Sequence, residues 1–384
     1  MPLDRRVWKE ACALRDAGYC VSVICPKGRG FMRSYEVLDG VTVYRHPAWE
    51  ASRTSGYFLE YTWALMAEFI LALKVFARTR FRILQACNPP DTIFLIALFL
   101  KLFNVRFIFD QHDLGPELFE AKFGKRSGPL YGLLRILELW SFRMANATIA
   151  TNDSFKAIAI TRGKKHPKSV FVVRNCPDLV TFCEPQVRPH NKFGKCNLVV
   201  YVGFMAPQDG LDLLLNSIEH IVHRGKRQDT HFLLVGGGSI LHELEAIIAE
   251  KELSPYVTLT GQVSHDEVAS WLSIADLGVA PDPKNAMNDK LTMIKILEYM
   301  AFSLPVVLFD LEEGKHTAGS AALYAKPNDP VDFANQVTRL LDCGELRRQL
   351  GNCGRKRIEE QLNWEIEKKS LIEAYSSVLL TEQL

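Results

Sequence analysis

Several features that mark common protein classes are absent from this chain of 384 residues. Its nine cysteines include no C-x-x-C pair and are odd in number, which favours reduced thiols in a cytosolic protein over a disulfide framework. The longest apolar segments, 63–76 and 92–103, are too short to span a bilayer and are interpreted as core helices. Charged residues interrupt any apolar run near the start, so no signal peptide is predicted.

A complete G-x-G-x-x-G after a predicted strand is also lacking, which argues against a nicotinamide-dependent oxidoreductase. Basic residues are dispersed and are not interleaved with aromatics, so nucleic acid is not expected as a partner.

Charge is nearly balanced overall, at +2, but its distribution is uneven. Residues 1–190 hold 27 Lys and Arg against 17 Asp and Glu, and residues 191–384 hold 19 against 27, so the halves carry +10 and −8. A basic half beside apolar helices suits an anionic membrane surface or a phosphate-bearing acceptor. Attraction between the two halves is the alternative.

Short apolar runs alternate with amphipathic segments along the whole chain. This alternation predicts an α/β fold with parallel sheets covered on both faces, divided into two doubly wound domains. The predicted domains are 1–184 and 196–354, joined by a polar linker at 185–195 and followed by a helical segment at 355–384. Twelve strands are predicted, at 20–25, 41–46, 82–87, 106–110, 147–151, 169–173, 197–202, 231–235, 257–261, 276–280, 305–309 and 321–325.

Ligands of such sheets bind beyond the carboxyl ends of the strands, so the loops after strands should carry the chemistry. In "VGGGS", Gly236, Gly237 and Gly238 would let a ligand approach the backbone, or they form a tight structural turn. In "FDQHDLGPE", His112 between carboxylates suits acid–base work or a hydrogen bond to a substrate hydroxyl, or it is a structural histidine.

The stretch "KLTMIKILEYMAFSLPVVLFD" holds a predicted helix capped by Thr292. Its first amides, at Met293, Ile294 and Lys295, would suit a diphosphate, and Lys295 would add a mobile positive charge. Glu298, on the same side as Lys295, could accept hydrogen bonds from two ribose hydroxyls. A solvent-exposed Lys–Glu pair of about 0.3 kcal/mol is the alternative interpretation.

Together these motifs resemble retaining glycosyltransferases of family 4, which have the GT-B fold. The resemblance extends over nearly the whole chain and is carried by "DRRVWKEA", "FDQHDLGPE", "YVGFMAPQDG", "NDKLTMIKILEYMAFSLPVV" and "SAALYA". The most similar patterns belong to bacterial members that build surface polysaccharides or lipid-linked glycans.

The resemblance implies a nucleotide-sugar donor bound mainly by the C-terminal domain and an acceptor bound by the N-terminal domain. It implies that Glu298 binds the nucleotide ribose, that "VGGGS" lies near the nucleotide and that His112 lies beside the transferred sugar. It also implies that no metal is needed, because helix amides and cationic side chains stabilise the departing diphosphate. The last helix should cross back to the N-terminal domain. The donor-site candidates are Gly203, Phe204, Gln208, Asp209, Gly236, Gly237, Gly238, Lys290, Thr292, Met293, Ile294, Lys295 and Glu298.

Three positions depart from the family pattern. Lys290 stands where a first glutamate is usual, and Asp289 could substitute for it by contacting sugar hydroxyls. Phe204 and Asp209 replace an Arg and a Lys that usually bind phosphate. The strand that normally precedes "DRRVWKEA" is missing, so we expect the natural reading frame to begin further upstream. Asp4 and Gly18 should bound the helix that follows.

The sequence therefore predicts a glycosyltransferase that acts on a glycan or lipid-linked acceptor at the cytoplasmic face of the membrane, with His112, Asp289 and Glu298 as catalytic candidates. The alternative is a catalytically impaired sugar-nucleotide-binding or scaffold protein of the same fold.

Overall fold

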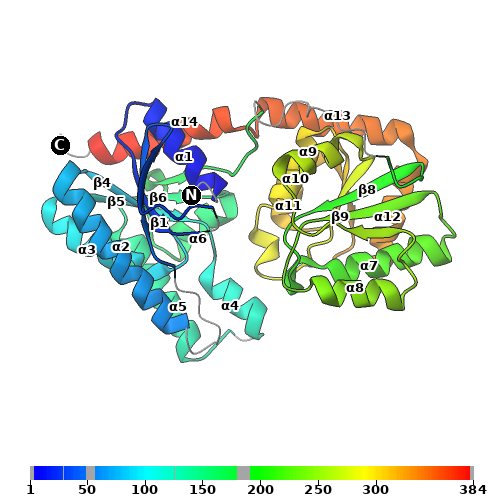
Figure 1. The fold of residues 1–384 in the computed structure, drawn as a ribbon, viewed down its shortest axis with the longest axis horizontal. Helices are drawn as coiled ribbons and strands as arrows, with labels where there is room; N and C mark the ends of the chain where they lie inside the picture. Colours follow the sequence, from blue (N-terminus) through cyan, green and yellow to red (C-terminus); the bar gives the residue numbers. More distant parts are fainter. Residues whose placement is uncertain (1–3, 29, 49–56, 125, 180–190, 381–384) are drawn as a thin grey trace. The chain divides into compact units, whose positions relative to one another are not determined.

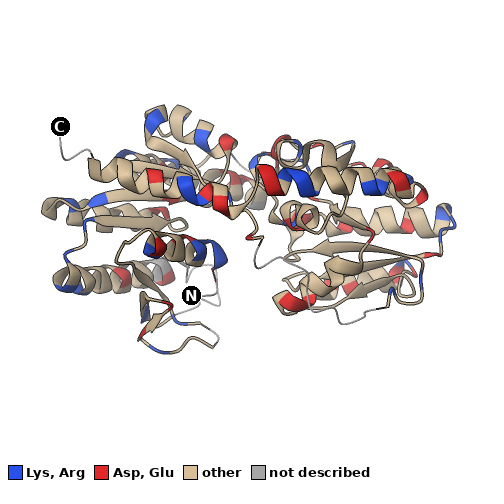
Figure 2. Cartoon of the chain, turned by 90° about the horizontal axis from the view of Figure 1, so that it is seen from above, with Lys and Arg blue, Asp and Glu red and all other residues tan. Residues whose placement is uncertain are grey.

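The computed structural model describes residues 4–28, 30–48, 57–124, 126–179 and 191–380 (Figure 1). The chain forms two compact units, Met1–Asn175 together with Glu367–Leu384, and Cys176–Ile366. We call them the N-terminal and C-terminal units. Lys and Arg occur on the surface helices of both units (Figure 2). The predicted linker 185–195 falls largely on residues outside those described, so it stays a prediction.

The N-terminal unit contains two sheets. β1 (Ser22–Pro26), β3 (Val41–His46) and β2 (Tyr35–Leu38) form one sheet in that order, with β2 antiparallel to β3. β4 (Ile83–Cys87), β5 (Arg106–Gln111), β6 (Ala147–Ala150) and β7 (Val170–Val172) form a parallel sheet in chain order. β5 and β6 are buried on both faces, as apolar strands between helix layers should be.

Helices of the N-terminal unit begin and end largely where local signals predict. The Asp4 side chain accepts a hydrogen bond from Val7 N at 3.1 Å at the start of α1 (Arg5–Asp16), and Gly18, with φ +90°, follows its end. The remaining helices are α2 (Tyr57–Thr79), η2 (Asp91–Ile93), α3 (Phe94–Leu100), η3 (Lys101–Phe103), α4 (Gly115–Phe123), α5 (Pro129–Met144), α6 (Asp153–Thr161) and η4 (Pro167–Ser169).

The C-terminal unit has one parallel sheet in the order β10-β9-β8-β11-β12-β13. Its strands are β8 (Asn197–Val202), β9 (Thr230–Val235), β10 (Val257–Leu259), β11 (Leu277–Ala280), β12 (Val306–Phe309) and β13 (Ala322–Ala325). Helices and turns follow the strands: η5 (Pro207–Asp209), α7 (Leu211–Glu219), η6 (His220–Arg224), α8 (Leu241–Glu250), α9 (His265–Ile274), η7 (Asn288–Lys290), α10 (Ile294–Ala301), α11 (Glu312–Ala318), η8 (Gly319–Ala321), α12 (Pro330–Asp342) and α13 (Gly344–Glu360).

The predicted α/β fold with two doubly wound domains is confirmed, and each of the twelve predicted strands occurs within two residues of its expected bounds. The short strand β2 was not predicted. The expected helical segment 355–384 is interrupted, because α13 ends at Glu360 and α14 (Trp364–Leu380) begins after a break. From Glu367 onward, α14 belongs to the N-terminal unit.

Two further observations bear on the composition. Within the described ranges, no helix has the length and apolar character that crossing a bilayer requires. The eight cysteines in the described part of the chain are all free thiols.

Candidate functional site

The order of strands in the C-terminal sheet marks where a ligand should bind. From β8 the chain moves to β9 and β10 on one side, and then returns to β11 on the other side of β8. The carboxyl ends of β8 and β11 are therefore the topological switch point, where crevices of doubly wound sheets accept ligands. The loops that meet there are 203–210 after β8 and 281–293 after β11.

A buried ion pair lies at this switch point. Lys295, in the first turn of α10, places its Nζ 2.9 and 3.1 Å from the two carboxylate oxygens of Asp282, which follows β11. The same Nζ lies 4.7 Å from the ring centroid of Tyr201 in β8, a cation–π contact. Burial alone would lower the pKa of Lys295, but the charge and the hydrogen bonds of Asp282, together with other nearby groups, raise it, so the ammonium stays protonated.

This pair corrects two predictions. Lys295 is buried and held by Asp282, so it is not a mobile cation on an exposed face, and its partner is not Glu298. Glu298 is half-buried in the next turn of α10. The interpretation of Lys295 and Glu298 as a weak surface pair is therefore wrong.

The start of α10 also differs from the prediction. The helix begins at Ile294 with Met293 as its N-cap in place of the predicted Thr292, and the Met293 side chain makes no capping hydrogen bond. Ile296 N bonds to Met293 O at 3.0 Å, and the amides of Ile294 and Lys295 precede it in the first turn. The helix thus starts one position later than predicted. The predicted amides of Ile294 and Lys295 lie in its first turn, and Met293 is the N-cap.

Tyr299 fixes α10 against the sheet. Its hydroxyl accepts a hydrogen bond from Val202 N at 2.8 Å and donates one to Val279 O at 3.1 Å, which joins the ends of β8 and β11. Its ring lies so close over β11 that a Cβ on Gly278 would come within 2.4 Å of it. Tyr299 therefore positions the helix whose first turn carries Lys295.

The glycines of "VGGGS" have a structural explanation. A Cβ on Gly236 would lie 1.9 Å from Gly203 O, and one on Gly238 would lie 2.0 Å from Met205 O. Gly203 N donates to Val235 O, and Met205 N donates to Gly237 O, each at 3.0 Å. The loops after β8 and β9 thus pack backbone to backbone, which requires Gly236 and Gly238 whether or not a ligand is bound.

The loop after β8 is also tied to the loop after β11. The buried Asn288 side chain donates to Gln208 O at 3.1 Å and to Pro283 O at 3.0 Å. Asp209 accepts from Ala206 N at 2.9 Å, and burial raises the pKa of its carboxyl. Phe204, by contrast, is exposed. The structure therefore gathers these candidate donor-site residues into two joined loops.

Asp289, predicted to contact sugar hydroxyls, has another partner. Its Oδ1 accepts a hydrogen bond from Glu312 N at 2.8 Å, at the start of α11, and lies 3.5 Å from Lys284 Nζ. One carboxylate oxygen is thus engaged within the protein. Lys290 is half-buried at the end of η7.

The N-terminal unit holds a second charged cluster, at the carboxyl end of β5. Arg6 of α1 donates to Asp110 Oδ1 at 3.0 Å and to Val173 O at 2.7 Å, and His112 Nε2 lies 2.8 Å from Asp110 Oδ2. Burial would raise the pKa of Asp110, but the charges of Arg6 and His112 hold it well below its usual range. Burial would lower the pKa of His112, but the charge of Asp110 raises it well above its usual range.

His112 can make one of two bonds with the same nitrogen. A protonated ring donates Nε2–H to Asp110, whereas a ring without this proton accepts from Arg6 Nε, which lies 3.0 Å away. Asn88 holds the backbone of this loop, since its Oδ1 accepts from His112 N at 2.7 Å and from Asp113 N at 3.2 Å. The backbone of His112 and the Nε2 atom of its ring are therefore both held in place.

The cluster extends to a second carboxylate and to the last helix. Gln85 donates to Glu10 Oε2 at 2.7 Å and to Asp110 Oδ2 at 3.0 Å, and Tyr375 of α14 donates to Gln85 Oε1 at 2.7 Å. Burial and the charge of Asp110 raise the pKa of Glu10 to about 7. Glu10 is thus a buried carboxyl that exchanges a proton near neutral pH.

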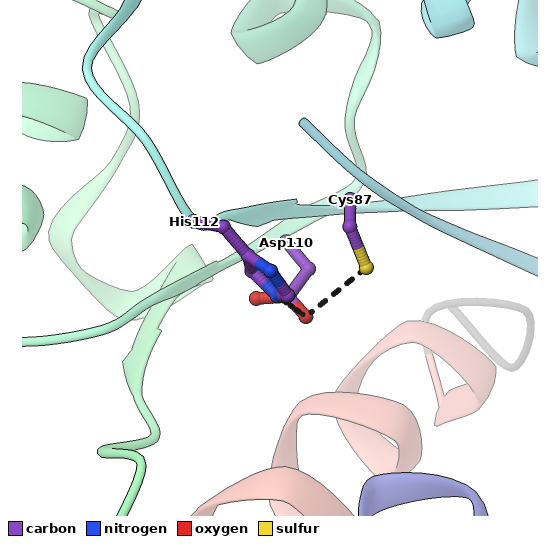
Figure 3. A group of neighbouring side chains, drawn as sticks. All are labelled: Cys87, Asp110 and His112. Atoms are coloured by element: carbon purple, nitrogen blue, oxygen red, sulfur yellow. Dashed lines mark hydrogen bonds and ion pairs between the residues drawn. The ribbon is translucent and has the colours of Figure 1, made fainter. Parts of the chain in front are cut away.

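Cys87, Asp110 and His112 form the group that most resembles a metal centre in the described ranges, with ligand atoms within 4.8 Å of one another (Figure 3). The guanidinium of Arg6 already contacts Asp110 and His112. Burial raises the pKa of Cys87 to about 12, which disfavours the thiolate that a metal would require. We therefore assign the group to the ion-pair network of Arg6.

Sequence reasoning missed Asp282, Arg6, Glu10 and Tyr299 as site residues. Arg6 and Glu10 are four residues apart on the buried face of α1, a spacing that could have indicated a charged group facing inward. Asp282 follows a buried strand, but nothing in its local sequence indicates Lys295 as its partner.

Comparison with known proteins agrees with this description. The family described as "Glycosyl transferase 4-like domain" matches residues 3–176, and the family described as "Glycosyl transferases group 1" matches residues 196–343. An uncharacterized glycosyltransferase of Methanocaldococcus jannaschii is 30% identical over 45% of this chain and 46% of its own length. The alpha-D-kanosaminyltransferase of Streptomyces kanamyceticus is 30% identical over 40% of this chain and 38% of its own length. The matched part of the chain thus spans less than half the length of these relatives.

Solved structures show the same fold. The sucrose-phosphate synthase of Thermosynechococcus elongatus aligns with a TM-score of 0.80 at 20% identity, over 98% of this chain and 93% of that one. The Anabaena protein HepE in complex with UDP-glucose aligns with a TM-score of 0.65 at 15% identity, over 88% and 86% of the two chains. The chain thus has the GT-B fold, and each of its two units contains a domain that matches a glycosyltransferase family.

Proposed function

We propose that this protein is a retaining glycosyltransferase that moves a sugar from a nucleotide-diphosphate donor to a glycan or lipid-linked acceptor in surface polysaccharide biosynthesis. The observation that carries the proposal is the placement of Lys295, Asp282 and Tyr201 beside the start of α10, at the switch point of the C-terminal sheet. A buried cation and a helix start at one place suit an anion that is bound out of bulk water.

The donor diphosphate would lie against the first turn of α10. The amides of Ile294 and Lys295 would donate to phosphate oxygens, and the positive charge of Lys295 would stabilise the negative charge that grows on the leaving diphosphate. Both carboxylate oxygens of Asp282 accept from the ammonium, which fixes its position beside the first turn of α10. Glu298, one turn further, would accept hydrogen bonds from the two ribose hydroxyls.

Two expected phosphate-binding cations are replaced by Phe204 and Asp209. The α10 amides, Lys295 and Lys290 would then carry the electrostatic stabilisation without a metal ion. Retention of configuration would follow from attack on the same face of the sugar that the diphosphate leaves, with a leaving-group phosphate oxygen helping to deprotonate the acceptor. The name of the kanosaminyltransferase and that of an MMP alpha-(1->4)-mannosyltransferase of Mycolicibacterium hassiacum, 25% identical over 44% of this chain, both specify alpha products, which supports this stereochemistry.

In the N-terminal unit, His112 would contact the transferred sugar or the acceptor. Asp110 and Arg6 both engage Nε2, so a hydroxyl of the sugar or of the acceptor would meet the ring at Nδ1, the other ring nitrogen. The positive charge of the residues in this half would favour a phosphate-bearing acceptor at the cytoplasmic face of the plasma membrane.

The proposal is tested by incubating the purified chain with UDP-, GDP- and ADP-sugars and measuring binding by calorimetry and hydrolysis or transfer by release of nucleoside diphosphate. We expect one donor class to bind and to be turned over. Binding without turnover, in the presence of lipid-phosphate and glycan acceptors, would instead favour the impaired sugar-nucleotide-binding protein. Absence of binding to every donor would contradict both.

A further inference from the structure

One face of the N-terminal unit exposes apolar side chains on three neighbouring helices. On α2, the residues Trp63, Met66 and Ile70 follow one another at helical spacing and are exposed, Ile70 by 60%. On α3 and η3, Leu95, Leu98 and Leu102 do the same, and Leu102 is 78% exposed. Each of these side chains stands where a surface helix normally carries polar residues.

The third helix continues the pattern. Leu133, Ile136 and Trp140 of α5 are exposed, again three or four residues apart. The helices are neighbours, because Phe69 of α2 packs edge-on against Phe99 of α3 with ring centroids 5.2 Å apart, and α5 packs against α3. Figure 1 shows α2, α3 and α5 within the same unit. We call the exposed side of α2, α3, η3 and α5 the apolar face.

Scattered apolar residues on a surface are ordinary, but a contiguous set is not. In the C-terminal unit, the exposed large apolar side chains of the described residues are Phe193, Phe204, Ile294, Val331 and Ile366, which lie on separate elements. The apolar face is therefore a local property of one unit.

Charge identifies the kind of partner. Among the described side chains of α2, α3, η3 and α5, the exposed charged ones are Lys74, Arg78, Arg135 and Arg143, all basic. The acidic residues of these helices, Glu60, Glu68 and Glu138, are half-buried or buried. A protein surface of apolar and basic side chains, without exposed acidic ones, complements a lipid bilayer whose interior is apolar and whose headgroups are anionic.

Two of these cations lie at helix ends, Arg78 in the last turn of α2 and Arg143 in the last turn of α5. In η3, burial and the charge of Arg106 lower the pKa of Lys101. Arg143 lies over the ring of Trp140, with its guanidinium carbon 5.9 Å from the ring centroid, and Arg80 lies over Phe76 at 5.2 Å. Aromatic rings paired with guanidinium groups suit the headgroup level of a bilayer, where an apolar body and a polar tip are both satisfied.

We propose that the apolar face docks the N-terminal unit on an anionic lipid bilayer, with Trp63, Ile70, Leu102 and Trp140 entering the headgroup boundary and Arg78 and Arg143 binding lipid phosphates. The apolar side chains would attach the unit to the bilayer, and the basic side chains would make it prefer anionic lipids. For the transferase proposed above, this surface would bring the unit that binds the acceptor to a lipid-linked acceptor.

The experiment is flotation of the full chain with vesicles of phosphatidylcholine alone or mixed with phosphatidylglycerol, without donor or acceptor, so that its outcome does not depend on the transferase activity. The wild type should float with the anionic vesicles and be released by high salt. Leu98→Glu with Leu102→Glu should lower the partition coefficient at least about tenfold. Arg78→Gln and Arg143→Gln should each lower it by about fivefold. The matched control, Val331→Glu in α12, should leave it unchanged.

A second measurement does not rely on the folding of the glutamate variants. Bromine-labelled lipid should quench wild-type tryptophan fluorescence, and Trp63→Phe with Trp140→Phe should remove most of the quenching. Flotation with neither vesicle type, or quenching that the double Phe variant retains, would overturn the proposal. So would light scattering that shows a dimer abolished by the Leu98 and Leu102 changes, because the apolar face would then bind a second copy of the chain.

Discussion

Each of the two units buries a cation at the carboxyl ends of its own strands, but the groups around that cation differ between the units. In the C-terminal unit, Lys295 has a single carboxylate partner, Asp282. In the N-terminal unit, Arg6 lies among Asp110, Glu10 and His112, and Glu10, with a pKa of about 7, can gain or lose a proton near neutral pH. The first arrangement has a fixed charge, and the second can adjust its charge with pH.

This difference has a physical cause. In the Lys295–Asp282 pair the two charges compensate each other, and the ring of Tyr201 and the more distant carboxyl of Asp209 add to the surroundings of the ammonium. Burial and the charge of Asp110 raise the pKa of Glu10 to about 7, and the charge of Asp110 raises the pKa of His112 against the effect of burial. A fixed cation suits electrostatic stabilisation of a leaving diphosphate, whereas a cluster that exchanges protons suits contact with reacting hydroxyls.

The largest effect is expected from breaking the fixed pair. Asp282→Ala leaves the Lys295 ammonium buried without its partner, which should lower the free energy of unfolding by about 3–5 kcal/mol. Asp282→Leu combined with Lys295→Met should recover most of that loss, because no buried charge remains. Urea denaturation of the single and double variants measures both values. If Asp282→Ala costs no more than a surface change, the pair is not buried as described.

A smaller loss is expected from the contact that fixes α10. Tyr299→Phe removes the acceptor of Val202 N and the donor to Val279 O, both buried, and should cost about 1–3 kcal/mol. The same denaturation experiment applies, with Tyr131→Phe on the half-buried side of α5 as the matched control. Equal stability of the two variants would show that the hydroxyl of Tyr299 is not a structural link.

The adjustable cluster is tested through pH. Because the pKa of Glu10 is raised from 4.5 to about 7 in the folded protein, its contribution to stability is complete below pH 4.5 and is lost as the pH rises through about 7. Glu10→Gln keeps an oxygen for Gln85 but cannot ionise, so stability should fall less between these pH values than it does in the wild type. Thermal unfolding across this range checks the prediction, and identical pH profiles would contradict it.

The smallest effect supplies the baseline. Arg348 and Glu345 form an exposed pair on α13, so Arg348→Ala should change the free energy of unfolding by less than about 0.5 kcal/mol. Urea denaturation measures it beside the Asp282 variants. A loss comparable to that of Asp282→Ala would mean that the denaturation experiment does not separate buried pairs from exposed ones.

Much of this fold could be predicted from the sequence, because strands such as 197–202 and 306–309 are continuous apolar runs bounded by turn residues. Local signals also predicted that α1 is capped by Asp4 and that Gly18 follows its end. The cap at Thr292 was a plausible local signal that failed, since the chain enters α10 through Met293. The first residue of a helix depends on how the preceding loop crosses the sheet. A helix that starts one residue later has the same pattern of apolar residues, so the sequence does not distinguish the two starts.

The partners of the buried charges could not be predicted. Lys295 pairs with a residue thirteen positions earlier, and Arg6 with one more than a hundred positions later. Which charges meet is decided by the order of strands in each sheet, and the local sequence does not specify that order. Glycines were predicted to be important in "VGGGS", but their packing against the loop after β8 required knowledge of strand neighbours.

The most direct test of the central claim, that the start of α10 binds a nucleoside diphosphate, is the dissociation constant of UDP and of GDP measured by calorimetry for the wild type and for Glu298→Ala. Glu345→Ala, an exposed glutamate of the same unit, is the control. We expect the control to match the wild type and Glu298→Ala to bind at least about tenfold more weakly, since two hydrogen bonds to a charged group are lost. Equal affinity of all three proteins would place the nucleotide elsewhere and contradict the account.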